Sequence, residues 1–286
     1  MRPMKPDPAI RVQKLRIPTP HGSIPALLLS PKRAPVNATG VLWLHGGGYI
    51  VGMKEMIHMS RAVDLVKKYG AVVLSPGYRL ALQAPYPAAI DDCYASLLHL
   101  KANAAALGVR SDQLMVGGES AGGGLCAAVC IRARDEGTVN VAFQMPLYPM
   151  LDDRDTETSR SNHGRVWNTR RNHLAWRLYL RRADRAHLSP YAAPARLADF
   201  SGLPPAYTFV GDGEPFFAEA VRYFGQLRAA GVPAELDVYH TDMHAFDMMD
   251  PDAVLSLQVA ECFNRHFADA QSRFFAPQPE NRRTCP

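Results

Sequence analysis

The pentapeptide Gly118–Gly122 has the sequence Gly-Glu-Ser-Ala-Gly, which few local folds accommodate. A small apolar run, Leu114–Gly117, leads into it, and a helix-forming run, Ala121–Arg134, follows it. This order predicts a serine on a sharp turn between a strand and a helix. Bulky side chains two positions on either side of the serine would collide with the neighbouring strand and helix. By itself the pattern is typical of a nucleophilic serine at the end of a buried strand or of an ordinary glycine-rich helix start, and the other motifs decide between them.

A glycine-rich loop follows a second apolar run. Val41–Leu44 is typical of a buried strand, and it ends in the sequence His-Gly-Gly-Gly at 45–48. Glycines in such a loop allow backbone N–H groups to face a bound substrate. Donors aimed in advance stabilise the negative charge on an attacked carbonyl oxygen by about 3–4 kcal/mol each. We therefore expect an oxyanion hole formed by the N–H groups of Gly47, Gly48 and Ala121. Which N–H groups of Gly46–Gly48 take part is left open.

Strand and helix patterns alternate along the chain, which predicts an α/β fold with a mostly parallel sheet and helices on both faces. The expected strands are Ala26–Leu29, Val41–Leu44, Ala71–Ser75, Leu114–Gly117, Ala142–Leu147, Tyr207–Val210 and Glu235–Tyr239. The expected helices are Ser60–Tyr69, Ala88–Ala105, Ala121–Asp135, Phe217–Ala230 and Asp252–Ala270. Loops that follow parallel strands meet at one edge of the sheet. Glu214 follows the predicted strand Tyr207–Val210, and His244 follows the predicted strand Glu235–Tyr239. We therefore expect the loops that carry Ser120, Glu214 and His244 to lie close together at that edge.

Taken together, these motifs resemble those of the hormone-sensitive-lipase-like carboxylesterases, the bacterial family IV esterases of the α/β-hydrolase superfamily. The resemblance runs from about Gly22 to about Phe267. The order serine, acid, histidine along the chain is also the α/β-hydrolase order. The motifs that carry the resemblance are His45-Gly46-Gly47-Gly48, Tyr78-Arg79-Leu80-Ala81, Pro85-Tyr86-Pro87-Ala88-Ala89, Gly118-Glu119-Ser120-Ala121-Gly122-Gly123, Gly202-Leu203-Pro204-Pro205, Val210-Gly211 and His244-Ala245-Phe246.

The resemblance implies a catalytic triad. Ser120 would attack an ester carbonyl, His244 would transfer the proton, and Glu214 would orient the imidazole and stabilise its charged form. The family acid is commonly Asp, so Glu214 is a departure, and Asp212 is a rival two positions earlier. His240 precedes His244 by four residues and is expected to be a packed or surface histidine.

Other residues near these motifs are expected to have supporting roles. His45 resembles the family histidine that braces the glycine loop, together with Gly46, and is not expected to act as a base. Glu119 stands where the family often has Asp, and it is expected to be a structural hydrogen-bonding partner that points away from the nucleophile. Asp242 is expected to form a turn.

The segment from about Asp152 to Leu188 interrupts the alternation and contains nine arginines with two tryptophans, Trp167 and Trp176. In the resembling family this insertion forms part of a cap over the active site, usually with helices from the N-terminus. Only 44 residues precede His45, so we expect a shortened N-terminal part of the cap and a more open pocket. The arginines predict a solvated basic face or, alternatively, the steering of an acidic ester.

Composition agrees with a single domain over residues 1–286, because 47% hydrophobic content can bury one large core. A polar tail, 276–286, is expected to be disordered. The first six residues lack an apolar signal core, the apolar runs are strand-sized, and aromatic residues are too sparse for a nucleic-acid surface. We therefore expect a cytoplasmic protein that binds neither membrane nor nucleic acid, while a homodimer is left open.

Five cysteines suit a reducing compartment, and Cys126 and Cys130 are expected to be core residues. No cofactor and no metal are predicted. The expected substrate is a small-molecule ester with a short- to medium-chain acyl group. An amidase, an arylformamidase or a lactonase on the same triad remains an alternative, because the chemistry up to the acyl-enzyme is shared. A non-catalytic small-molecule receptor is a further alternative.

Overall fold

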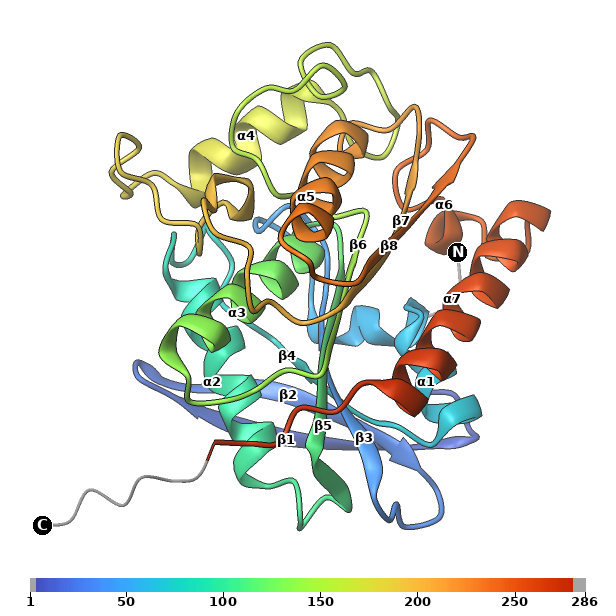
Figure 1. The fold of residues 1–286 in the computed structure, drawn as a ribbon. Helices are drawn as coiled ribbons and strands as arrows, with labels where there is room; N and C mark the ends of the chain where they lie inside the picture. The colour runs from blue at the N-terminus through green and yellow to red at the C-terminus, as the bar shows by residue number, and fades with distance from the viewer. Residues whose placement is uncertain (1–3, 280–286) are drawn as a thin grey trace, which may run out of the picture.

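The computed structural model describes residues 4–279, and within them eight strands form one sheet (Figure 1). The strands are β1 (Ile10–Thr19), β2 (Gly22–Pro31), β3 (Ala38–Leu44), β4 (Val72–Pro76), β5 (Val109–Glu119), β6 (Phe143–Leu147), β7 (Ala206–Gly211) and β8 (Ala234–Tyr239). Across the sheet they stand in the order β1-β2-β4-β3-β5-β6-β7-β8. β2 pairs antiparallel with β1 and with β4, and the other neighbours are parallel. The expected α/β fold with a mostly parallel sheet is confirmed.

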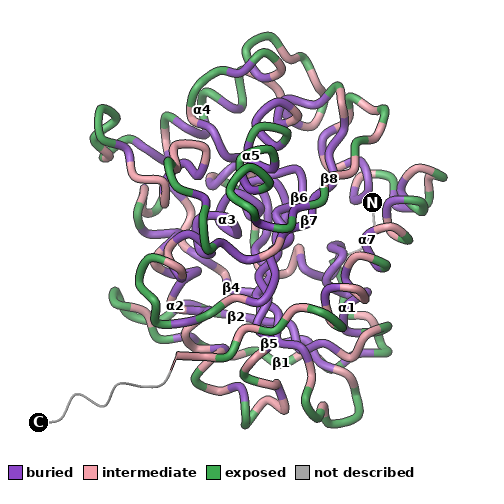
Figure 2. Tube along the Cα trace, viewed as in Figure 1, coloured by how far each residue is buried: buried purple, intermediate pink, exposed green. Residues whose placement is uncertain are grey.

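Helices cover both faces of this sheet. The α-helices are α1 (Ala62–Tyr69), α2 (Ala88–Ala102), α3 (Ala121–Glu136), α4 (Thr169–Tyr179), α5 (Phe217–Ala229), α6 (Phe246–Met249) and α7 (Val254–Arg273), with short 3-10 helices η1 (Lys54–Met59) and η2 (Pro194–Arg196). In β3, Leu42 and Leu44 pack on the side of α2 and α3, whereas Val41 and Trp43 pack on the side of α1 and α7. Successive residues of a strand face opposite sides, so a strand covered on both faces is apolar throughout. Figure 2 shows the buried central strands.

Each expected strand and helix is present, with ends shifted by five residues or fewer. The strand that the sequence did not predict is β1, which pairs with β2 alone at the edge of the sheet. Its apolar and polar residues alternate from Ile10 to Val12, but Lys14 breaks the alternation before Leu15. An edge strand tolerates such an interruption because much of it faces solvent.

The described N-terminal residues pack against α1 and form the edge of the sheet. Asp7 forms an ion pair with Lys67 of α1, at 2.8 Å between Oδ2 and Nζ. Residues 10–31 then form the hairpin of β1 and β2. In Figure 1 this hairpin runs along the bottom of the molecule, whereas α4 lies at the top. The hairpin thus uses most of this segment as sheet edge, and the insertion that contains α4 lies at the opposite end of the molecule in Figure 1.

The prediction of a disordered tail is wrong for the first residues of that tail. Ala276 N–H donates to the Asp112 carbonyl at 2.7 Å. The Asn140 side chain donates to the Pro277 carbonyl at 2.6 Å, and Gln278 donates to the Asn140 carbonyl at 2.8 Å. The carbonyl groups of Asp112 and Asn140 and the Asn140 side chain, near the amino ends of β5 and β6, thus hold this part of the tail. Residues 280–286 of the predicted tail lie outside the described residues.

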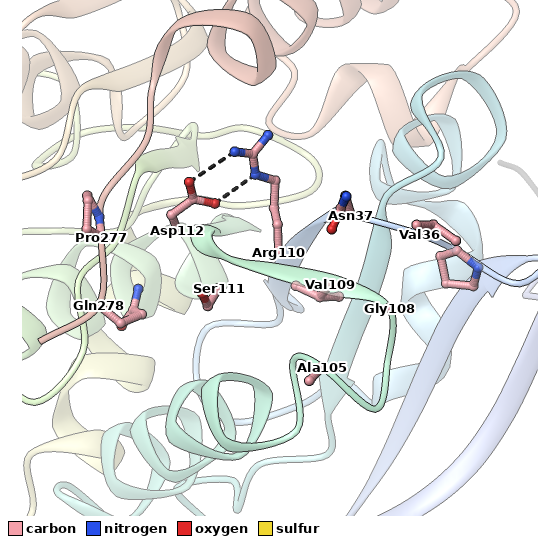
Figure 3. A pocket seen from close by; sticks show the side chains of 11 residues that line it. Val36, Asn37, Ala105, Gly108, Val109, Arg110, Ser111, Asp112, Pro277 and Gln278 are labelled. Atoms are coloured by element: carbon pink, nitrogen blue, oxygen red, sulfur yellow. Dashed lines mark hydrogen bonds and ion pairs between the residues drawn. The ribbon is translucent and has the colours of Figure 1, made fainter. Parts of the chain in front are cut away.

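A surface hollow of about 930 Å³ lies at the amino ends of β3 and β5 (Figure 3). Its lining includes Asn37, Val109 and an ion pair of 2.7 Å between Arg110 and Asp112. Ser120 follows the opposite end of β5, and a strand of this length spans roughly 30 Å. The hollow is therefore remote from the edge where the expected catalytic residues lie. Among residues 4–279, no helix is both long enough and apolar enough to span a membrane.

Candidate active site

Ser120 occupies a strained turn between β5 and α3. Its backbone angles are φ 57° and ψ −119°, in a region that residues with a side chain rarely adopt. The flanking glycines are required by close packing. A Cβ atom at Gly122 would lie 2.0 Å from the Leu44 carbonyl oxygen, and one at Gly118 would lie 2.5 Å from that oxygen. The steric reason for the two glycines, argued from the sequence, is present in the structure.

Three predicted residues meet at the carboxyl edge of the sheet. Ser120 Oγ is 2.9 Å from Nε2 of His244, and His244 Nδ1 contacts a carboxylate oxygen of Glu214. Glu214 lies in the loop after β7, and His244 lies in the loop after β8. All three side chains are buried, and Ser120 is 7% exposed. The structure thus joins these residues from three separate loops into one chain of hydrogen bonds.

The rival acid lies elsewhere. Asp212 forms an ion pair of 2.9 Å with Nδ1 of His240, whose side chain is 99% exposed. Its other carboxylate oxygen accepts from the backbone N–H of Thr241 at 3.2 Å. Asp242 is exposed in the same loop. Asp212 and His240 thus form a surface pair, no turn is present at Asp242, and Glu214 is the carboxylate in contact with His244.

The surroundings of the Glu214–His244 pair are largely apolar. Burial raises the pKa of Glu214, and the neighbouring His244 opposes that rise. The rings of Tyr148 and Phe216 stand edge-on to the imidazole, with centroids 5.2 and 5.0 Å away. A positive charge on His244 would find its main compensation in the Glu214 carboxylate, because few other polar groups surround it.

His45 holds the glycine loop against Ser120. Its Nδ1 lies 2.8 Å from the Gly46 carbonyl oxygen, and its ring stacks on Tyr78 at 4.2 Å between centroids. The Tyr78 hydroxyl donates to the His45 carbonyl at 2.8 Å. Burial lowers the pKa of His45 to about 4, so the neutral ring donates through Nδ1. A Cβ atom at Gly46 would lie 3.3 Å from Ser120 Cβ, which places the loop beside the nucleophile.

The expected oxyanion donors lie in this loop and at the start of α3. Gly47 and Gly48 have φ angles of 115° and 60°, which glycine adopts without strain. In the described part of the chain, neither of their N–H groups donates to a backbone acceptor. Ala121 is the first residue of α3, and its N–H has no partner within the helix. The three donors next to Ser120 are available to a ligand.

A model of the family described as alpha/beta hydrolase fold matches residues 41–248, which include the glycine loop, Ser120, Glu214 and His244. Esterase LipI of Mycobacterium tuberculosis is 31% identical over 243 residues, covering 84% of this chain and 76% of the relative. Carboxylesterase NlhH of the same species is 34% identical over 231 residues, covering 78% and 71%. The chain belongs to the hormone-sensitive-lipase-like carboxylesterases. The resemblance seen in the motifs is confirmed.

Solved structures agree with this membership. A bacterial heroin esterase superposes on this carboxylesterase with a TM-score of 0.85 and 31% identity, covering 93% of this chain and 83% of that protein. A hyperthermophilic esterase from the archaeon Pyrobaculum calidifontis superposes with a TM-score of 0.83 and 31% identity, covering 92% and 85%. Both cover the sheet and the segments around it, so the α/β-hydrolase fold extends over nearly the whole carboxylesterase.

One residue of the inserted segment of the carboxylesterase covers the glycine loop. A Cβ atom at Gly48 would lie only 2.1 Å from the Trp167 ring, so the indole rests directly on that glycine. Trp167 is 8% exposed, and its ring centroid is 6.4 Å from that of Phe216, the neighbour of His244. Trp167 therefore forms one wall of the space above Gly48, and the more open pocket remains a prediction. Trp167 was noted in the sequence, but its contact with a glycine 119 residues earlier depends on how the cap folds back.

A buried ion pair behind the histidine loop was not foreseen. Arg61 Nε donates to Asp247 Oδ2 at 2.8 Å, and Tyr148 Oη donates to Asp247 Oδ1 at 3.1 Å. Arg61 is 1% exposed and precedes α1, whereas Asp247 lies in α6, three residues after His244. Arginine and aspartate are common on surfaces, so the sequence carried no signal that these two are buried together.

Glu119 has the structural role expected for it. Its carboxylate accepts a hydrogen bond of 2.9 Å from Trp43 Nε1, on the side of the sheet covered by α1 and α7. Burial raises the pKa of Glu119 to about 8. Glu119 therefore ties β5 to β3 directly before Ser120.

Proposed function

We propose that this carboxylesterase hydrolyses short- to medium-chain acyl esters through an acyl-enzyme, with Ser120 as nucleophile, His244 as base and Glu214 as acid. The observation that carries the proposal is the unbroken chain of contacts from Ser120 Oγ through the imidazole to Glu214. Membership of the carboxylesterase family supports the same chemistry.

In the first half of the reaction, His244 Nε2 takes the proton of Ser120 while Oγ bonds to the ester carbonyl carbon. The carbonyl oxygen becomes an oxyanion, which the N–H groups of Gly47, Gly48 and Ala121 stabilise. The imidazolium then gives its proton to the alcohol oxygen as the carbon–oxygen bond breaks. The alcohol leaves, and the acyl group stays on Ser120 as an ester.

In the second half, water takes the place of the alcohol. His244 removes a proton from water as its oxygen attacks the acyl carbon, and the same N–H donors stabilise the second oxyanion. The proton returns to Ser120 Oγ when the acid leaves. Glu214 acts through His244 in both halves, because its carboxylate holds Nδ1 as a donor and balances the positive charge of the ring.

The position of Trp167 supports the preference for short acyl groups. The indole lies against Gly48 and near Phe216, so it narrows the space beside the oxyanion loop. Each extra methylene favours binding by about 0.8 kcal/mol only when it is buried. A long acyl chain with no room to be buried gains nothing and must displace the indole.

The test combines labelling with a substrate panel. A fluorophosphonate probe should modify wild-type enzyme once, and S120A should not react. Nitrophenyl esters of increasing chain length should be hydrolysed with rates that fall beyond medium chains. Faster turnover of anilides, formamides or lactones of matched size would assign one of those classes instead. A protein that neither reacts with the probe nor hydrolyses any member of the panel would contradict the proposal.

A further inference from the structure

A second cluster of reactive side chains lies between β8 and α7, at the edge of the sheet and outside the proposed catalytic site. Cys262 and His266 are four residues apart on α7 and share one face of that helix. Asp237 lies opposite them on β8, the last strand of the sheet. One ligand atom from each of these three residues lies within 4.8 Å of the other two. Figure 1 shows α7 passing beside this end of the sheet.

The three groups converge on a single carboxylate oxygen. Cys262 Sγ lies 2.9 Å from Asp237 Oδ2, and His266 Nε2 lies 3.6 Å from the same oxygen. Sulfur, imidazole nitrogen and carboxylate oxygen are the donors that bind Zn²⁺ in proteins, at 2.0 to 2.3 Å from the metal. Ligands around a tetrahedral ion stand about 3–4 Å apart. The spacing here therefore requires only small side-chain movements to enclose an ion.

The neighbours of the cluster hold its members in the orientation that a metal needs. The Glu235 carboxylate lies 3.4 Å from Nδ1 of His266, so it favours a proton on that nitrogen and leaves Nε2 to face Asp237. The imidazole also stacks on Tyr207 at 3.9 Å between centroids. The Tyr207 hydroxyl donates to Asp237 at 2.8 Å. Carboxylates and hydroxyls that orient metal ligands in this way contribute to affinity in known sites.

We propose that Asp237, Cys262 and His266 form a binding site for a zinc-like divalent cation, with the fourth position open to solvent. Because the ligands come from β8 and α7, a bound ion would clamp the edge strand to the last helix. Arg265 opposes binding, since its exposed guanidinium donates to Cys262 Sγ at 3.1 Å and must move away before a cation can enter. None of these residues contacts Ser120, Glu214 or His244, so the site is independent of the proposed ester hydrolysis.

Cobalt binding tests the proposal directly. Full-length protein would be freed of its affinity tag, treated with a chelator and titrated with Co²⁺, which gives a thiolate charge-transfer band when a cysteine binds it. All samples would carry C285S, so that the thiol of Cys285, which lies outside the described residues, does not bind the added Co²⁺. We expect one equivalent of Co²⁺ to bind, the band to appear, and Zn²⁺ to displace it.

Single substitutions then assign the ligands. C262S should abolish the band, and D237N and H266A should each weaken Co²⁺ binding at least tenfold. R265Q should strengthen it by about fivefold, since it removes a competing positive charge near the sulfur. D269N is the matched control: Asp269 lies on the same helix and pairs with Arg273 instead, so binding should equal that of wild type.

Stability supplies a second readout. Zn²⁺ should raise the melting temperature of wild type and leave that of C262S unchanged, because a ligand stabilises only the folded form that binds it. Circular dichroism and nitrophenyl ester hydrolysis of each metal-free variant show whether it is folded. No saturable binding by wild type would overturn the proposal, as would a charge-transfer band that survives in C262S.

Discussion

Ser120 illustrates how a single residue can be held in an unfavourable conformation by its neighbours. Its φ of 57° costs on the order of 1–3 kcal/mol, which the surrounding contacts must offset. Its N–H donates to the Leu147 carbonyl, and its carbonyl accepts from Met150 N–H, each at 3.0 Å. The strain directs the hydroxyl toward His244 and away from the helix.

The first prediction concerns the proton-transfer pair. S120A and H244A should each lower kcat for a short-chain nitrophenyl ester by about 10⁴-fold or more, because each removes a step that the other requires. The double variant should be hardly slower than either single one. Circular dichroism serves as the control for folding. An S120A enzyme that kept a tenth of the wild-type kcat would exclude this serine as the nucleophile.

The second prediction separates the two candidate acids. E214Q should lower kcat by orders of magnitude, because an amide favours the wrong tautomer of the histidine. The same change of the acid in a Ser-His-Asp triad lowers kcat about 10⁴-fold. D212N should lower it by a few-fold at most, since Asp212 pairs with the exposed His240. Both substitutions keep the size of the side chain, so steady-state kinetics compare them directly. The opposite ranking would move the acid to Asp212.

The third prediction concerns the ionisation of Glu119. Its folded-state pKa of about 8 lies above the ordinary value of 4.5, so its stabilising contribution is full below pH 4.5 and is lost as the pH rises to 8. E119Q stays neutral and keeps the acceptor for Trp43. From pH 5.5 to 8.5 the free energy of unfolding of E119Q should gain on that of wild type by at most about 3 kcal/mol.

Urea unfolding at the two pH values measures this difference. E261Q, which changes an exposed glutamate of α7, is the control and should follow wild type at both. Equal pH dependence in E119Q and wild type would mean that Glu119 is ionised in the folded protein throughout this range.

At the scale of elements, the insertion with α4 lies above loops that belong to the sheet. Asn168 caps α4 by accepting from the Arg171 N–H at 3.1 Å. Trp167 directly precedes this cap, so the start of α4 fixes where the indole lies over Gly48. The segment therefore contributes a wall to the site, and its many arginines lie largely on its outer side.

The fourth prediction tests that wall. W167A should move the preferred nitrophenyl ester to longer acyl chains, raising kcat/KM for medium and long chains relative to acetate, because methylenes then have space in which to be buried. W176A is a matched control, since Trp176 packs on Tyr49 and Tyr179. An unchanged chain-length profile in W167A would show that another residue limits acyl length.

At the scale of the whole molecule, the buried pair of Arg61 and Asp247 links the first helix to the loop that carries His244. Asp247 accepts from both Arg61 and Tyr148, and Tyr148 stands edge-on to the His244 imidazole. A buried charge without its partner is costly, whereas the intact pair contributes little net energy. The pair therefore specifies where the histidine loop lies against the rest of the protein.

The fifth prediction follows from this pair. D247N should lower the free energy of unfolding by up to about 3–5 kcal/mol, because it leaves the buried Arg61 charge with Asp64, 3.8 Å away, as its remaining carboxylate partner. The midpoint of urea unfolding measures the effect. D269N removes one partner of an exposed pair with Arg273 and should change the midpoint little. Similar midpoints for the two variants would show that solvent reaches Arg61.

Local sequence determined most of the elements, though not β1, α4 or α6, and it determined the residue types of the motifs. Val41–Leu44 and Leu114–Gly117 are apolar because both faces of their strands are covered, and Gly118 and Gly122 are glycines because no Cβ atom fits there. Such requirements act within a few residues, so they are visible in the chain itself. The loops that carry Ser120, Glu214 and His244 were predictable for the same reason, whereas the role of each remains a prediction.

Tertiary structure alone decided which distant residues meet. Trp167 on Gly48, Arg61 beside Asp247, and Asp237 opposite Cys262 are contacts between segments whose separate patterns carry no sign of their partner. The choice between Glu214 and Asp212 is of the same kind, since both follow β7 and only the path of the loop brings one of them to His244. The type of a residue determines which chemistry its side chain can perform. The packing of the whole chain determines which other side chain it contacts.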